Sequence, residues 1–120
     1  MRIVVTAQQD DLHGLVDPRF GRAQYFMLYD LETDKYTAHN NEQNLNATQG
    51  AGVQAAQNIA RLGADAVLTG HVGPRAFSTL QAAGIKVYID VSGNVDEAIA
   101  NYRSGTLREV NKPDVAGHWM

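Results

Sequence analysis

Cysteine is the first residue type that the sequence lacks. None of its 120 residues is a cysteine, which excludes disulfides, cysteine-ligated zinc, thiolate-anchored iron–sulfur clusters and cysteine nucleophiles. An excess of positive charge is also missing, because ten basic residues stand against thirteen acidic ones, for a net charge of −3. A general nucleic-acid or acidic-membrane binder would be basic overall. We therefore expect neither partner, and any anion site must be local.

Long apolar runs are absent as well. No stretch approaches the roughly 20 apolar residues of a membrane span, and the chain leads from Met1 into a short apolar segment without the pattern of a signal peptide. We therefore expect a cytoplasmic protein. The sequence has no repeat or interior linker, so its length predicts one domain. We place this domain at residues 1–110 and expect residues 111–120, which show no periodicity, to form a flexible tail.

The apolar pattern that is present predicts five strands and three helices. Asn94 and Glu97 resemble a capping box that opens the third helix, and Gly63, Gly84 and Gly105 are predicted to end the helices. Right-handed crossovers place the strands in the order 3-2-1-4-5, with strand 2 antiparallel to the others. The predicted fold class is α/β, with a ribonuclease-H-like, five-stranded mixed sheet. Strands are expected at residues 2–6, 25–31, 35–41, 66–69 and 85–89, and the first two helices at 51–62 and 74–83.

Seven of the eleven glycines fall in loops that follow the carboxyl ends of predicted strands 1, 3, 4 and 5. They are Gly14, Gly21, Gly50, Gly52, Gly70, Gly73 and Gly93. Ligands bind at this edge of an open α/β sheet, and the predicted topology gathers all three helix N-termini there, whose N–H groups attract anions. Arg19, Arg22 and Arg75 belong to the same edge. We interpret it as a site for a negatively charged ligand.

Other interpretations of this edge stay open. The arginines could pair with Asp10, Asp11 or Asp17, which would leave a regulatory interaction domain whose glycine-rich edge binds no ligand. The edge could also belong to a small enzyme that acts on a phosphorylated small molecule, with His71 as its one candidate general base. Nuclease chemistry is disfavoured, because two-metal catalysis needs carboxylates on the central strands and Asp65, the nearest, lies at the wrong end of its strand.

Several motifs taken together resemble a known family. In chain order they are RFGRA at 19–23, YF at 25–26, GAG at 50–52, GADAV at 63–67, GHVG at 70–73 and GIKVY at 84–88. Across residues 1–110 this combination closely resembles the dinitrogenase iron–molybdenum cofactor biosynthesis family. That family includes the NifX and NafY carriers, the C-terminal domain of NifB, and a carrier of a molybdenum–copper sulfide cluster.

The resemblance implies a non-enzymatic carrier or storage protein for an anionic, molybdenum-containing metal–sulfide cluster that is held non-covalently. The cluster would be a molybdenum–copper sulfide or the iron–molybdenum cofactor or its precursor, exchanged with donor and acceptor proteins. Arg19 stands where the family often has histidine, and a histidine-rich tail is reduced to His118, which shifts the expected binding from coordination towards electrostatic and apolar docking. The expected cofactor-binding residues are Arg19, Phe20, Gly21, Arg22, Gly50, Gly52, Gly70, His71, Val72, Gly73 and Arg75, with His71 also the candidate metal ligand.

Overall fold

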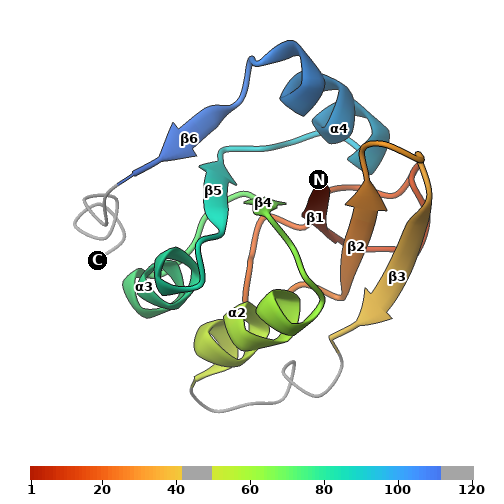
Figure 1. Cartoon of the computed structure of the whole chain (residues 1–120). Helices are drawn as coiled ribbons and strands as arrows, with labels where there is room; N and C mark the ends of the chain where they lie inside the picture. Colours follow the sequence, from red (N-terminus) through yellow and green to blue (C-terminus); the bar gives the residue numbers. More distant parts are fainter. Residues whose placement is uncertain (42–49, 112–120) are drawn as a thin grey trace.

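A computed structural model describes residues 1–41 and 50–111 of the chain (Figure 1). These residues form one mixed sheet and three helices. The strands are β1 (Arg2–Ala7), β2 (Tyr25–Asp30), β3 (Tyr36–Asn40), β4 (Ala66–Leu68), β5 (Lys86–Ile89) and β6 (Arg108–Val110). The helices are α2 (Ala51–Arg61), α3 (Pro74–Ala82) and α4 (Val95–Ser104). The longest of them has 11 residues, whereas a bilayer span takes about 20, so none of the described helices could cross a membrane.

The sheet has the strand order β3-β2-β1-β4-β5-β6. The first five strands lie in the predicted order, and β2 is antiparallel to β1 as predicted. The five-stranded, ribonuclease-H-like sheet was nevertheless wrong, because β6 adds a sixth strand antiparallel to β5. This strand has three residues, and only Val110 among them is buried. A segment this short shows no detectable alternation of apolar and polar residues. It is a strand because it pairs with the open edge of β5, a contact that the local sequence does not reveal.

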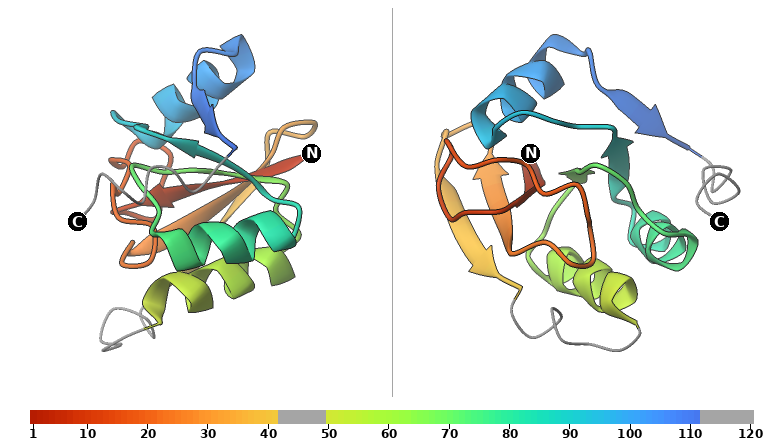
Figure 2. Two further views of the ribbon diagram at one scale, coloured as in Figure 1. Left: turned by 90° about the vertical axis from the view of Figure 1, so that its left-hand side faces the viewer. Right: turned by 180° about the vertical axis from the view of Figure 1, so that it is seen from behind.

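The sheet is covered on both faces, which creates two cores. Helices α2 and α3 lie on one face and α4 on the other (Figures 1 and 2). Strand β1 alternates between them: Val4 packs into the core under α2 and α3, whereas Ile3 and Val5 pack into the core under α4. All three side chains are completely buried. This is why β1 reads as a continuous apolar run rather than as an alternating one.

The ends of the helices follow the local sequence signals. Gly63, Gly84 and Gly105, which were predicted to end the helices, all have positive φ angles. The predicted capping box of α4 is confirmed. The Glu97 amide donates to Asn94 Oδ1 at 2.8 Å, and the Asn94 amide donates to Glu97 Oε1 at 3.2 Å. Helices α2 and α3 begin after Gly50 and Gly73, as predicted.

Strand β6 can be tested through Val110, which pairs with Val87 and packs into the core under α3. We expect Val110→Ala to lower the free energy of unfolding by about 1–2 kcal/mol, because it removes buried methyl groups. The neighbouring Glu109 is exposed, so Glu109→Ala should change stability by less than about 0.5 kcal/mol. Denaturant unfolding of both variants checks this, and equal effects would show that β6 does not contribute to the core.

Candidate functional site

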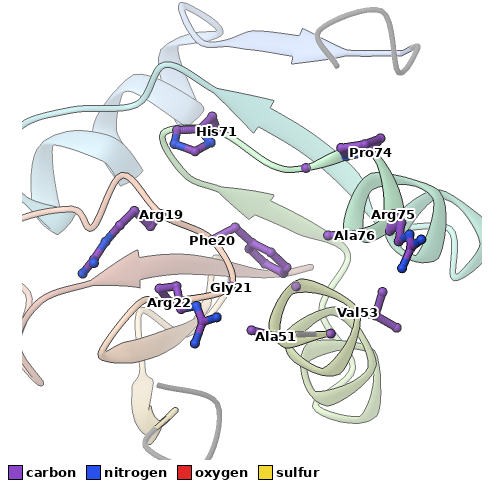
Figure 3. A pocket seen from close by; sticks show the side chains of 13 residues that line it. Arg19, Phe20, Gly21, Arg22, Ala51, Val53, His71, Pro74, Arg75 and Ala76 are labelled. Carbon is purple, nitrogen blue, oxygen red and sulfur yellow. The ribbon is translucent and has the colours of Figure 1, made fainter. Parts of the chain in front are cut away.

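A cleft of about 480 Å³ opens where β1 and β4 end, between the loop at residues 17–23 and the first turns of α2 and α3 (Figure 3). Its volume falls in the range of small-molecule sites, roughly 300–1,000 Å³. The lining residues are Arg19, Phe20, Gly21, Arg22, Gly50, Ala51, Gly52, Val53, His71, Gly73, Pro74, Arg75 and Ala76.

Nine of the eleven predicted residues line this cleft, and Gly70 and Val72 do not. Val72 is 1% exposed and belongs to the core under α2 and α3. Sequence reasoning missed four lining residues, which are Ala51, Val53, Pro74 and Ala76. Their side chains are small or apolar and carry no chemical signal. Only their position could have identified them, because each lies in the first turn of a helix that begins after Gly50 or Gly73.

The N-termini of α2 and α3 have no side-chain caps. Gly50 and Gly73 occupy the N-cap positions, and neither first turn contains an acidic residue. In these two first turns, the amides of Ala51, Gly52, Val53, Arg75 and Ala76 have no acceptor among the described residues. Such amides, together with the helix dipole, create partial positive charge and donate hydrogen bonds to anions. The N-termini of α2 and α3 therefore both face the cleft.

The N-terminus of α4, in contrast, is already satisfied. The Val95 amide donates to the Gly14 carbonyl and the Asp96 amide to the Leu12 carbonyl, both at 3.0 Å. The capping box occupies the next amide, and two carboxylates lie in the first turn. Because α4 lies on the other face of the sheet and does not line the cleft, only two of the three expected helix N-termini meet at the site.

Two of the three predicted arginines point into the cleft. Arg22 comes from the loop and Arg75 from α3, whereas Arg19 extends away from both helices (Figure 3). Arg19 instead pairs with the buried carboxylate of Asp17, with 3.3 Å between Nε and Oδ1. The alternative that an arginine of this loop pairs with Asp17 is thus confirmed for Arg19. Arg75 is exposed and has no carboxylate within ion-pair distance among residues 1–41 and 50–111.

Hydrogen bonds fix the loop across the ends of two central strands. The Asp17 amide donates to the carbonyl of Thr6, near the end of β1, at 2.9 Å, and the Thr6 hydroxyl donates to the Asp17 carbonyl at 2.6 Å. The Thr6 and Thr69 hydroxyls lie 2.8 Å apart, and beyond β4 the His71 amide donates to the Pro18 carbonyl at 3.0 Å. Because its donors and acceptors are paired, this wall of the cleft is preorganised.

Close backbone contacts complete the wall and explain two of the glycines. A Cβ atom on Gly70 would lie 2.5 Å from both the Cα and the carbonyl oxygen of Pro18, and one on Gly21 would lie 2.8 Å from the Gly52 nitrogen. Only glycine permits such approaches. Gly70 therefore joins β4 to the loop, and Gly21 joins the loop to the first turn of α2.

The Gly70 contact can be tested against a matched control at Gly73. Gly70→Ala forces Pro18 to move, so we expect it to lower the free energy of unfolding by about 2–3 kcal/mol. Gly73 has a φ of −69°, and a Cβ atom added there would meet no described atom within 4 Å beyond its chain neighbours. Gly73→Ala should therefore change stability by less than about 1 kcal/mol, because the entropy it removes from the unfolded chain opposes the poorer N-cap preference of alanine. Thermal and denaturant unfolding distinguish the two variants, and similar losses for both would contradict the packing argument.

The chemistry of the cleft suits an anion. Its ionisable side chains are three arginines and His71, and residues 1–41 and 50–111 contain no cluster of three or more His, Asp or Glu side chains that could hold a metal ion. Metal coordination by His71 stays a prediction, and His118 lies outside the described residues. The donor set of amides and guanidinium groups therefore fits a preformed anion better than a bare metal cation.

Comparisons with known proteins agree on one group of relatives. Residues 1–105 match the family model described as dinitrogenase iron-molybdenum cofactor. The fold matches the apo form of the orange protein from Desulfovibrio gigas, with a TM-score of 0.89 and 45% identity over 92% of this chain and 96% of that one. A candidate NifB protein from Thermotoga matches with a TM-score of 0.81 and 34% identity over 92% and 94% of the two chains. An uncharacterized protein of Methanocaldococcus jannaschii is 30% identical over 96 residues, which are 78% of this chain and 81% of the relative.

Proposed function

The chain belongs to the dinitrogenase iron-molybdenum cofactor family, and from this premise we propose that it is a non-enzymatic carrier of an anionic, molybdenum-containing metal–sulfide cluster. The observation that supports this most is the meeting of two uncapped, acid-free helix N-termini with Arg22 and Arg75 at one cleft. The cluster is cargo, held without covalent attachment and passed between donor and acceptor proteins.

The lining fits the two chemical features of a metal–sulfide anion. Its negative charge would be met by the five amides of the first turns and by Arg22 and Arg75, since hydrogen bonds to charged groups are the stronger ones. Its sulfide surface is large and weakly hydrated, and it would lie against apolar side chains such as Phe20, Val53 and Pro74. Phe20 is 2% exposed, and its ring centroid lies 5.9 Å from that of Phe26. The floor of the cleft, which Phe20 forms, is therefore part of the core.

The expected affinity suits a carrier. A hydrogen bond to a charged group contributes about 1.5–3 kcal/mol. Three or four of them contribute roughly 5–12 kcal/mol in total. At the upper end of that range, after about 4 kcal/mol for ordering the cluster and the side chains, the net is about −8 kcal/mol, which corresponds to micromolar binding. Binding of this strength retains a cluster and still allows its release to a second protein.

We propose a molybdenum–copper sulfide as the first cargo to test and the iron–molybdenum cofactor or its precursor as the second. The resemblance of the sequence motifs to a family that includes a carrier of a molybdenum–copper sulfide cluster favours the first. The proposed cofactor-binding residues are those of the predicted set that line the cleft, except Arg19, which pairs with Asp17. Catalysis on a phosphorylated substrate is less well supported, because among the described lining residues His71 would be the only general base, with no carboxylate or hydroxyl nucleophile beside it.

Removing one cleft arginine should weaken binding of tetrathiomolybdate, a simple molybdenum–sulfide anion. We expect Arg75→Gln and Arg22→Gln each to raise the Kd about ten- to hundredfold, which corresponds to about 1.5–3 kcal/mol. Higher salt should reduce the difference from the wild type because exposed charges are screened. Arg61→Gln is the matched control, since Arg61 is exposed at the opposite end of α2. Visible absorption titration measures the Kd of all three variants. An equal loss of affinity in Arg61→Gln would show that the effect comes from the net charge of the protein and not from the cleft.

A carboxylate placed at the N-cap of α3 should compete with the cluster. Gly73 has φ −69° and ψ 164°, which suits an N-cap aspartate that would accept from the Arg75 and Ala76 amides. We expect Gly73→Asp to leave the melting temperature unchanged or slightly raised while increasing the Kd at least about tenfold, because the amides are occupied and a negative charge is added.

The neutral variant Gly73→Asn separates these two causes. It caps the same amides without adding charge, so its Kd should lie between those of the wild type and Gly73→Asp. Calorimetric titration with tetrathiomolybdate checks both variants. Wild-type affinity in both would mean that the α3 amides do not bind the anion.

A further inference from the structure

Asp17 is the one buried charged residue among residues 1–41 and 50–111. Its side chain is 0% exposed, and that of its partner Arg19 is 57% exposed. Oδ1 accepts the Arg19 amide at 3.0 Å and Nε at 3.3 Å, and Oδ2 accepts Nη2 at 3.5 Å. A buried carboxylate is costly unless it is paired and hydrogen-bonded. This one lies in the wall of the cleft, where an anion is proposed to bind.

We infer that Asp17 is a positioning residue of the cleft and that Arg19 is its counter-ion rather than a ligand of the cluster, an inference that rests on the proposed function. Its first role is geometric. The bond from the Arg19 amide to Oδ1 closes a turn at Asp17, and this turn aligns Arg19 beside His71 in a parallel bridge. The next two residues then reach their places, with Phe20 in the floor and Gly21 against α2.

The second role is electrostatic. The charges of Asp17 and Arg19 cancel within the wall, so the cluster meets the positive charge of Arg22, Arg75 and the two helix N-termini. Without the Arg19 guanidinium, the Asp17 carboxylate, which lies behind the lining of the cleft, would repel the anion through buried protein that screens charge less than solvent does. Arg19 was expected to bind the cluster directly, and its orientation away from the helices (Figure 3) assigns it this compensating role instead.

Three variants with tetrathiomolybdate as the probe separate these roles. Arg19→Gln leaves the carboxylate uncompensated, so we expect the Kd to rise about tenfold and the melting temperature to fall. The double variant Asp17→Asn/Arg19→Gln restores a neutral pair and keeps an Oδ1 acceptor for the turn. Its Kd should lie within about threefold of the wild type.

The double variant Asp17→Ala/Arg19→Gln has the same charge but no acceptor. Its Kd should exceed that of the asparagine variant about three- to tenfold, the effect of one lost hydrogen bond. All affinities are measured below the lowest melting temperature, with circular dichroism to confirm folding.

The outcomes are distinct. If Arg19 is a direct ligand, Asp17→Asn/Arg19→Gln binds as weakly as Arg19→Gln, which overturns the inference. If Asp17 serves stability alone, the two double variants differ in melting temperature but not in Kd, which also overturns it. Arg75→Gln tests the proposed function separately. A wild type that does not bind the probe refutes that function and this inference together, whereas Arg75-dependent binding combined with a weak asparagine variant refutes the inference alone.

Discussion

The site depends on the attachment of one loop across the carboxyl ends of β1 and β4. Thr6 bonds to Asp17 in both directions, and Gly70 meets Pro18 without space for a side chain. This attachment carries Phe20 into the core and Gly21 onto the first turn of α2. The cleft is therefore made by the same contacts that close the end of the core. These contacts preorganise one wall of the cleft, which reduces the ordering cost of binding.

The charge of the protein is distributed by local chemistry rather than by composition. The chain is acidic overall, yet the described lining of the cleft contains arginines and no carboxylate. The first turns of the helices differ in charge in the same way. Helix α4 has Asp96 and Glu97 in its first turn and a complete capping box, whereas the first turns of α2 and α3 have neither a cap nor an acid. An acidic protein can in this way present one strongly anion-binding surface, which suits the transient holding of a charged cluster.

Much of this arrangement could be predicted from the sequence, because its signals are local. The glycines after each helix, the Asn94–Glu97 box and the apolar run of β1 each act over a few residues. Strand β6 could not be predicted, since its one buried residue acquires a pattern only beside β5. The roles of the arginines could not be separated either. Asp17 and Arg19 are two residues apart in the sequence, but the loop that contains them is attached to Thr6 on β1 and to His71 beyond β4. The first amides of α4 bond to the carbonyls of Leu12 and Gly14. These long-range contacts could not be predicted from the local sequence either.

The proposed function depends on the unsatisfied amides of α2 and α3 binding the anion. Amide chemical shifts followed by NMR during titration with tetrathiomolybdate test this most directly. We expect the amide signals of residues 51–53 and 75–76 to shift together with those of residues 19–23, at one common Kd, while those of residues 95–97 in the capped helix do not move. Shifts confined to residues 112–120, or equal shifts at all three helix N-termini, would contradict it.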